Sequence, residues 1–123
     1  MLPNFLVHET IVRESGEGAV FEIGQDSRRS LLLTFSITHA VEQQSIHFEV
    51  HGSRDGRIWQ PLLKVAPKCY CGDYHATLPP SDSLYLKAKW RVTRWARNDH
   101  RPYFRFHVFA EAPKTLAAYA GAA

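Results

Sequence analysis

The segment SIHFEVHG, residues 45–52, decides the fold class because apolar and polar residues alternate along it. Ile46, Phe48 and Val50 are apolar, and the residues between them are polar. Successive side chains of a β-strand point to opposite faces of a sheet, so this alternation is typical of a strand with one buried and one exposed face. We therefore expect residues 45–52 to form a half-buried antiparallel strand.

The same alternation appears in several other short segments, which are separated by residues typical of turns. LLLTFSIT, residues 31–38, follows it, as do residues 85–92 and 104–110. Asp55-Gly56 is a strong hairpin signal between two such segments. No segment of ten or more residues has the pattern of an amphipathic helix. About seven or eight short strands with turns between them predict an all-β fold, an antiparallel β-sandwich of the jelly-roll or discoidin-like type.

The length of 123 residues indicates one domain, since an independent core usually needs ~100–150 residues. We expect residues 1–123 to form a single β-sandwich domain, with the alanine-rich residues 113–123 as a flexible or short helical tail. No secretory signal is visible, and no apolar run approaches the ~20 residues of a membrane-spanning helix. The sequence therefore predicts a soluble cytoplasmic protein without a membrane partner, in which Cys69 and Cys71 are free thiols.

Basic residues are concentrated near the C-terminal end of the chain, although the formal net charge is only +3. Between Lys87 and Arg105 there are seven basic residues and one acidic residue, whereas the rest of the chain has eight basic and eleven acidic residues. If residues 85–92 and 103–110 pair as a hairpin, their alternation places these cations and several aromatic rings on one outer face. Cations attract phosphates and rings stack on bases, so one interpretation of this hairpin is a polyanion-binding surface.

The candidate ligand-binding residues belong to this basic, aromatic hairpin and its connection. They are Lys87, Lys89, Arg91, Arg94, Trp95, Arg97, Arg101, Tyr103, Arg105 and His107. The interpretation that we favour for this hairpin is a solvated face, because outward residues of a strand are polar and because lysine and arginine protect sheet edges from aggregation.

Two resemblances concern the middle and C-terminal parts of the chain. The run FEVHGSRDGRIWQPL contains the pattern Ser-x-Asp-Gly-x-x-Trp at Ser53, Asp55, Gly56 and Trp59. It resembles a hairpin of discoidin-like, or galactose-binding-like, β-sandwiches, which implies a fold and no ligand. PKCYCGDYHATL, followed by YLKAKWRVTRWARNDHRPYFRFHVFAEA, looks like part of a family of short bacterial proteins of unknown function. That resemblance implies a bacterial protein and no activity or site residue.

The sequence predicts no metal site, no cofactor and no catalytic residue. His47 and His51 lie four strand positions apart, about 13 Å, whereas the ligands of one metal ion lie within about 2 Å of it. The chain has neither the glycine-flanked serine of a nucleophile elbow nor a glycine-rich phosphate loop. The residues that come nearest to a metal-ligand set are His47, Glu49, Cys69, Cys71 and His75.

Three functions are compatible with these observations. The first is a non-catalytic binding or interaction module of unknown ligand, working through a protein or carbohydrate contact, as a homo-oligomer or as a subunit of a larger assembly. Its candidate contacts are Trp95, Tyr103 and Phe109. The second is nucleic-acid or polyanion binding through the hairpin of residues 85–109. The third is a metal-dependent enzyme, which no motif supports. We favour the first and expect that the protein is not an enzyme.

Overall fold

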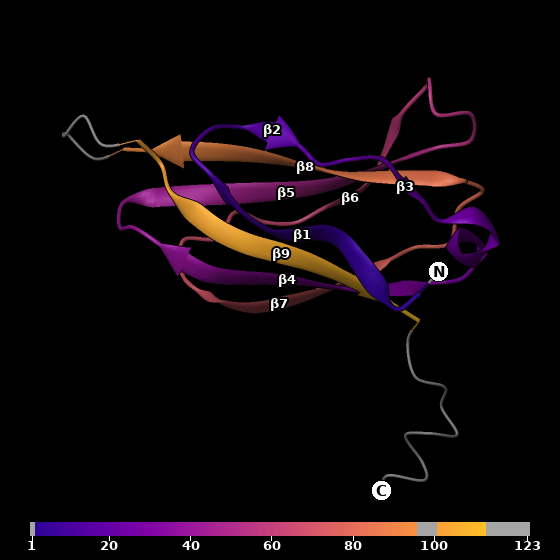
Figure 1. Cartoon of the computed structure of the whole chain (residues 1–123), viewed down its shortest axis with the longest axis horizontal. Helices are drawn as coiled ribbons and strands as arrows, with labels where there is room; N and C mark the ends of the chain where they lie inside the picture. The colour runs from indigo at the N-terminus through magenta and orange to yellow at the C-terminus, as the bar shows by residue number, and fades with distance from the viewer. Residues whose placement is uncertain (1, 96–100, 113–123) are drawn as a thin grey trace, which may run out of the picture.

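The structure, a computed structural model, describes residues 2–95 and 101–112. Within these ranges the chain forms nine strands and one short 3-10 helix (Figure 1). The elements are β1 (Asn4–Val12), β2 (Gly16–Glu17), β3 (Phe21–Glu22), η1 (Gly24–Arg28), β4 (Leu31–Ala40), β5 (Gln44–Ser53), β6 (Gln60–Lys64), β7 (Gly72–Leu78), β8 (Tyr85–Arg94) and β9 (Phe104–Glu111). The all-β prediction is confirmed, and the count exceeds seven or eight because β2 and β3 have two residues each.

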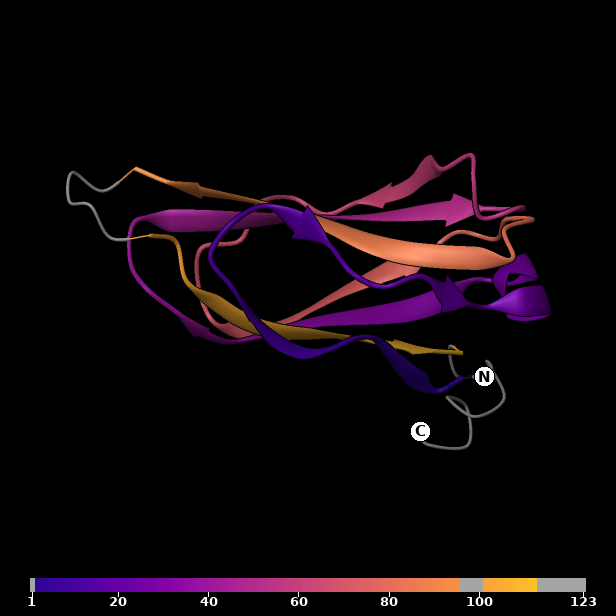
Figure 2. The same cartoon turned by 45° about the horizontal axis from the view of Figure 1, so that its top comes forward.

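The strands form two antiparallel sheets that face each other as a sandwich (Figure 2). Sheet A has the order β1-β9-β4-β7, and sheet B has the order β2-β8-β5-β6, with β3 also paired to β8. In Figure 1 sheet B lies at the top and sheet A below it. The predicted β-sandwich is therefore confirmed.

The alternation predicted for β5 is present in the structure. Ile46, Phe48 and Val50 are completely buried between the sheets, and the polar residues between them are half-buried on the outer face. In β4 the alternation ends at Ser36, which is also buried, and near the register shift between Ile37 and His39 the side chains of Thr38 and His39 are exposed. Apolar residues thus determine which face of each strand turns inward.

The core contains a row of aromatic rings drawn alternately from the two sheets. Phe48 of sheet B lies between Phe35 and Phe106 of sheet A, with ring centroids 4.9 and 5.0 Å apart. Phe106 in turn contacts Trp90 of sheet B at 5.3 Å. Burial of each phenylalanine contributes about 1.5–3 kcal/mol. This interdigitated row therefore holds the two sheets together.

The predicted hairpin of residues 85–92 and 103–110 is wrong. β8 pairs with β5, from Gln44 opposite Arg94 to Ser53 opposite Tyr85, whereas β9 pairs with β1 and β4 in the other sheet. The connection between β8 and β9 crosses from one sheet to the other. Each strand has an apolar inner face, and these faces meet across the core rather than side by side. The outward residues of the two strands consequently lie on opposite sides of the molecule.

The predicted Asp-Gly turn is present between β5 and β6. Hydrogen bonds from backbone N–H groups to the side chains of Ser53 and Asp55 hold it. Ser53 Oγ accepts a hydrogen bond from the Gly56 N–H at 2.8 Å, and Gly56 has a φ of 77°. Asp55 Oδ1 accepts hydrogen bonds from the N–H groups of Arg57 and Ile58 at 2.8 and 3.0 Å. These backbone bonds, together with the Ser53 hydroxyl, lower the pKa of Asp55. The Ser-x-Asp-Gly pattern is thus a self-contained turn.

Residues 113–123, predicted as a tail, lie outside the described residues. Among the residues that are described, no helix has the length and apolar character needed to cross a membrane. Cys69 and Cys71 are both free and lie in the connection between β6 and β7.

Candidate anion-binding site

The lysines of β8 are engaged by neighbouring side chains on the outer face of sheet B. Lys87 Nζ lies 3.5 Å from Glu17 Oε2, and Lys89 Nζ lies 3.8 Å from the same atom. Lys87 Nζ is also 4.3 Å from the centroid of the Trp59 ring, and only 12% of this lysine side chain is exposed. Lys87 is therefore covered by a carboxylate and an indole and has little surface left for a ligand.

The strand beside β8 adds an acidic residue and imidazoles to the same face. Glu49 stands opposite Lys89 and His51 stands opposite Lys87. Burial lowers the pKa of His51, and the charge of Lys89 lowers this pKa further. The outer face of sheet B thus mixes cations with carboxylates. This face does not have the uniform positive charge that the hairpin predicted.

Arg105 and His107 lie on the outer face of sheet A, where Glu9 contacts both. Arg105 Nη2 donates a hydrogen bond to Glu9 Oε2 at 3.0 Å, and His107 Nδ1 lies 3.8 Å from Glu9 Oε1. Thr38 Oγ1 donates a hydrogen bond to Glu9 Oε1 at 2.9 Å. This Thr38 bond, followed by the charge of Arg105, lowers the pKa of Glu9. Arg105 therefore already forms an ion pair with an acidic residue of the same sheet.

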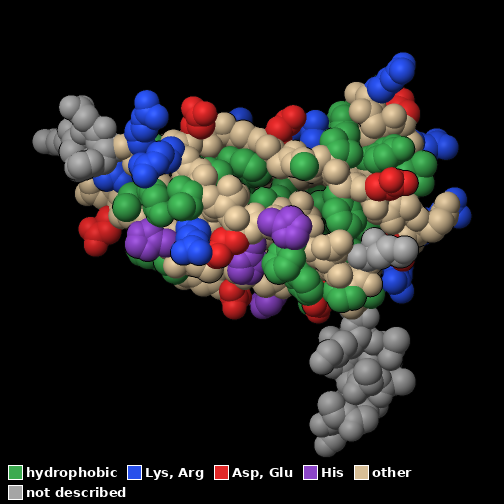
Figure 3. Space-filling model, in the orientation of Figure 1, with side chains coloured by type: hydrophobic (Ala, Val, Ile, Leu, Met, Phe, Trp, Pro, Cys, Tyr) green, Lys and Arg blue, Asp and Glu red, His purple; other side chains and the backbone are tan. Residues whose placement is uncertain are grey.

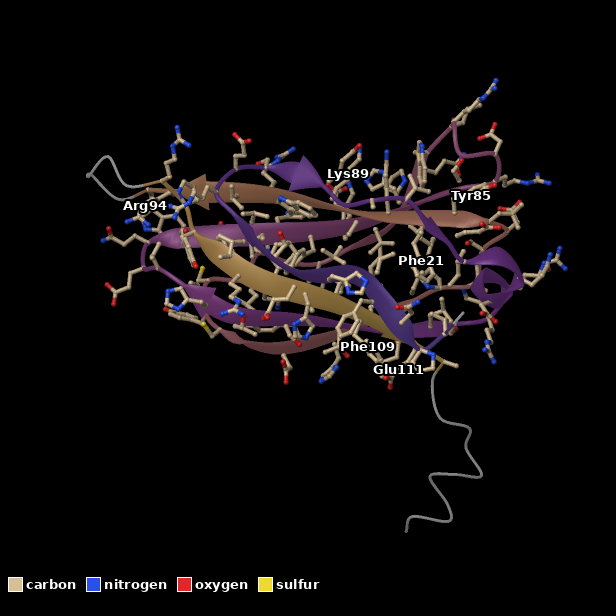
Figure 4. The ribbon with its side chains drawn as sticks, in the orientation of Figure 1. Phe21, Tyr85, Lys89, Arg94, Phe109 and Glu111 are labelled. Atoms are coloured by element: carbon tan, nitrogen blue, oxygen red, sulfur yellow. The ribbon has the colours of Figure 1, made fainter. Side chains whose placement is uncertain are left out.

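A third group of predicted residues converges at the end of the sandwich where β8 ends and β9 begins. Figure 3 shows Lys and Arg side chains gathered there, and Figure 4 labels Arg94 at this end of β8. They border a hollow of about 360 Å³, here called the basic pocket. It is lined by Arg13, His39, Val41, Arg94, Arg101 and Tyr103. None of these lining residues, taken from the described part of the chain, is acidic.

Tyr103 contacts two other residues that line the basic pocket. The Arg13 guanidinium carbon is 5.0 Å from the centroid of the tyrosine ring, and the His39 ring meets it edge-on at 5.1 Å. A guanidinium over an aromatic face is attracted by the ring quadrupole while its N–H groups stay available. The tyrosine ring therefore orients Arg13 beside a site that Arg94 and Arg101 also border.

A buried amide fixes the backbone of Tyr103. Gln44 is completely buried; its Nε2 donates to the Tyr103 carbonyl at 2.5 Å, and its Oε1 accepts from the Tyr103 N–H at 2.8 Å. These two bonds join the first residue of β5 to the segment that leads into β9. The site is consequently anchored to sheet B although Tyr103 precedes a strand of sheet A.

A second hollow, of about 440 Å³, lies at the same end of the sandwich. Two of its side chains are prominent rings: Tyr70 is 79% exposed and Trp95 is 56% exposed. Tyr74 Oη donates a hydrogen bond to the Tyr70 carbonyl at 2.6 Å, which supports this loop. We call this hollow the aromatic pocket; it is lined by Ala40, Val41, Glu42, Gln43, Cys69, Tyr70, Cys71 and Trp95.

The nine predicted ligand-binding residues that the structure describes are thus divided among four places. Arg94, Arg101 and Tyr103 come together in the basic pocket, and Trp95 lines the aromatic pocket. The other described residues of that set lie on the two outer faces, Lys87, Lys89 and Arg91 on sheet B and Arg105 and His107 on sheet A. Arg97 lies outside the described residues.

Arg13, His39 and Tyr70 are site residues that sequence reasoning did not identify. Arg13 follows β1, and His39 lies near the end of β4, far from the basic segment in the sequence. The charged window between Lys87 and Arg105 could not include them. The only available signal was the position of His39 directly after the predicted strand of residues 31–38, where loops from distant segments can meet; no predicted strand ended near Arg13.

The candidate metal ligands do not converge. His47 and Glu49 lie on the outer face of sheet B, whereas His75 lies on β7 of sheet A, where its Nδ1 is 3.1 Å from Thr34 Oγ1. Across residues 2–95 and 101–112, no three His, Cys, Asp or Glu side chains are grouped in a way that could hold a metal ion. Glu9, His107 and Phe5 form a further outer cluster, in which the Phe5 ring meets His107 edge-on at 5.5 Å.

Comparison of the chain with protein-family models, with curated proteins and with solved structures found no match. The site geometry is therefore the basis for the functional argument.

Proposed function

We propose that this protein is a non-catalytic binding module whose basic pocket recognises an anionic group of its ligand. The observation that supports this proposal is that two exposed arginines, Arg13 and Arg101, line one pocket together with Tyr103, and that none of the described residues lining it is acidic. On the two outer faces, Glu17 contacts Lys87 and Lys89, and Glu9 contacts Arg105.

The chemistry of arginine favours binding over catalysis at this place. A guanidinium keeps its charge at every physiological pH, so it does not exchange protons with a substrate. Its planar fork matches phosphate, sulfate and carboxylate oxygens in a bidentate manner. The Tyr103 ring holds the Arg13 guanidinium before a ligand arrives, which reduces the entropy lost on binding.

The proposal predicts that polyanion binding depends on where the basic residues lie, and not on the net charge of the protein. Arg13→Glu/Arg101→Glu reverses two charges in the basic pocket, and Lys89→Glu/Arg91→Glu makes the same charge change on the outer face of sheet B. Labelled heparin, a polyanion without bases, is titrated into each protein and followed by fluorescence polarisation at 50–200 mM salt. The pocket variant should bind at least about tenfold more weakly, since each charge-assisted hydrogen bond contributes about 1.5–3 kcal/mol. The outer-face variant should lose less than about threefold.

Two results would contradict the proposal. Equal weakening by both double variants would mean that net charge alone attracts the polyanion. If the unaltered protein does not bind heparin at 50 mM salt, the basic pocket does not bind anions. Far-UV circular dichroism of both variants confirms that each keeps its strand content.

A further inference from the structure

The basic pocket and the aromatic pocket are adjacent. Both include Val41, which belongs to the turn between β4 and β5. Arg94 lines the first pocket and Trp95, the next residue, lines the second. The Trp95 N–H donates a hydrogen bond to the Gln43 carbonyl of that turn at 3.0 Å. Consecutive residues of an extended segment point to opposite sides, so a cation and a ring are held on either side of one turn.

The two pockets differ in chemistry in a way that selects a ligand. The first has guanidinium groups, and the second has the exposed rings of Tyr70 and Trp95. A ligand that occupies both therefore carries an anionic group next to a flat ring. Glu42 lines the aromatic pocket, where its carboxylate repels an anion. The anionic group must then lie in the basic pocket and the ring beside Trp95.

A nucleotide unit has this arrangement, with a phosphate joined through a sugar to a planar base. The hollows of about 360 and 440 Å³ fall in the range of ligand pockets, roughly 300–1,000 Å³. A base can stack on an indole only when it is neither paired nor stacked within a duplex. Arginines that follow the backbone and rings that stack on bases are the features of single-strand binding sites.

We propose that this protein binds single-stranded nucleic acid across the turn of Val41, with phosphates in the basic pocket and a base stacked on Trp95 in the aromatic pocket. The inference rests on the proposed function and adds the class of ligand. It differs from the predicted polyanion hairpin, because Lys87, Lys89 and Arg105 are not part of this surface.

Fluorescence polarisation with labelled 12-nucleotide single strands of DNA and RNA tests the inference, beside a duplex of the same sequence. Single strands should bind at least about tenfold more tightly than the duplex. Each neutralised phosphate of a single strand contributes about −0.7 to the slope of log K against log salt. Because two exposed arginines, Arg13 and Arg101, line the basic pocket, that slope should be about −1.4.

The variant Trp95→Ala distinguishes the contribution of base stacking to binding from the contribution of charge. Loss of one base–ring contact should weaken single-strand binding about five- to a hundredfold, while heparin binding should stay within about twofold of that of the unaltered protein. Ile58→Ala is the matched control, since Ile58 is an exposed apolar residue beyond the opposite end of β5. It should change neither affinity. Arg13→Glu/Arg101→Glu should weaken both.

The outcomes distinguish this inference from the proposed function. If heparin binds but single strands do not, if Trp95→Ala binds single strands normally, or if the duplex binds equally well, the inference is overturned and the anion pocket stands. A phosphotyrosine peptide that binds more tightly than the single strands would also overturn it, and would assign the surface to a protein partner. Failure of heparin to bind overturns the proposed function itself.

Discussion

At the scale of single residues, Gln44 has a structural role that its residue type does not suggest, because it fixes the backbone of Tyr103. Glutamine is usually exposed, yet this one is completely buried and pairs with both backbone groups of Tyr103. The sequence could not indicate this role, because the partner lies 59 residues away. The tyrosine could be singled out as an aromatic residue in a basic segment, but the amide that positions it could not.

Gln44→Leu should lower the free energy of unfolding by about 1–3 kcal/mol, since it leaves the Tyr103 N–H and carbonyl without their partners. Gln60→Leu, the same change at an exposed position of β6, should stay within about 0.5 kcal/mol of the unaltered protein. Urea unfolding followed by tryptophan fluorescence measures both. Equal unfolding free energies for the two variants would show that the Gln44 amide does not stabilise this end of the sandwich.

At the scale of elements, Glu9 links three strands of sheet A. It lies on β1, accepts a hydrogen bond from Thr38 of β4 and forms an ion pair with Arg105 of β9. These partners lower its pKa below the ordinary value of 4.5, with the Thr38 bond as the larger cause. Between the lowered pKa and 4.5, the unfolded chain binds more protons than the folded one. The stability that Glu9 contributes is therefore lost as the pH falls through this window.

Glu9→Gln should consequently unfold with a weaker pH dependence than the unaltered protein below about pH 4.5. Thr38→Val, which removes the hydrogen bond, should raise the pKa of Glu9 toward its ordinary value and reduce the pH dependence in the same direction. Urea midpoints measured at intervals from pH 3 to pH 7 give the comparison. Parallel curves for Glu9→Gln and the unaltered protein would contradict the assignment.

The pairing of strands was the part of the element level that could not be predicted. In β8 and β9 the alternation of apolar and polar residues is visible in the sequence, and the structure confirms it for Leu86, Ala88, Phe104 and Phe106, which are all buried. The alternation shows which face of a strand is exposed to solvent, but it does not show which other strand pairs with it. Sequence neighbours often pair; here the connection between them crosses the sandwich instead.

At the scale of the whole molecule, stability depends on contacts between sheets. Phe48 lies between two phenylalanines of the opposite sheet. Phe48→Ala should cost about 3–5 kcal/mol, a large share of the 5–15 kcal/mol of a typical domain. Phe5→Ala, the same change at an exposed residue of the outer face, should cost about 1 kcal/mol. Thermal unfolding followed by circular dichroism compares the two, and a similar loss in both would refute the role assigned to the aromatic row.

The same arrangement explains why only part of the candidate site was predictable. A charged window along the sequence includes residues of both sheets, because β8 and β9 are consecutive. Folding separates Lys87 and Lys89 from Arg105, and it brings Arg13 and His39 to Arg94 and Arg101. Binding sites at the ends of a sandwich are assembled from several loops, so their composition follows from topology rather than from any one segment.

The sequence by itself determined the class of fold, the inner faces of β4, β5, β8 and β9, and the Asp-Gly turn, because each depends on neighbouring residues through the pleat of a strand or the bonds of a turn. Only the tertiary structure decided the partners of β8 and β9, the burial of Gln44 and the two adjoining pockets. These features depend on how two apolar faces meet, which involves residues far apart in the chain.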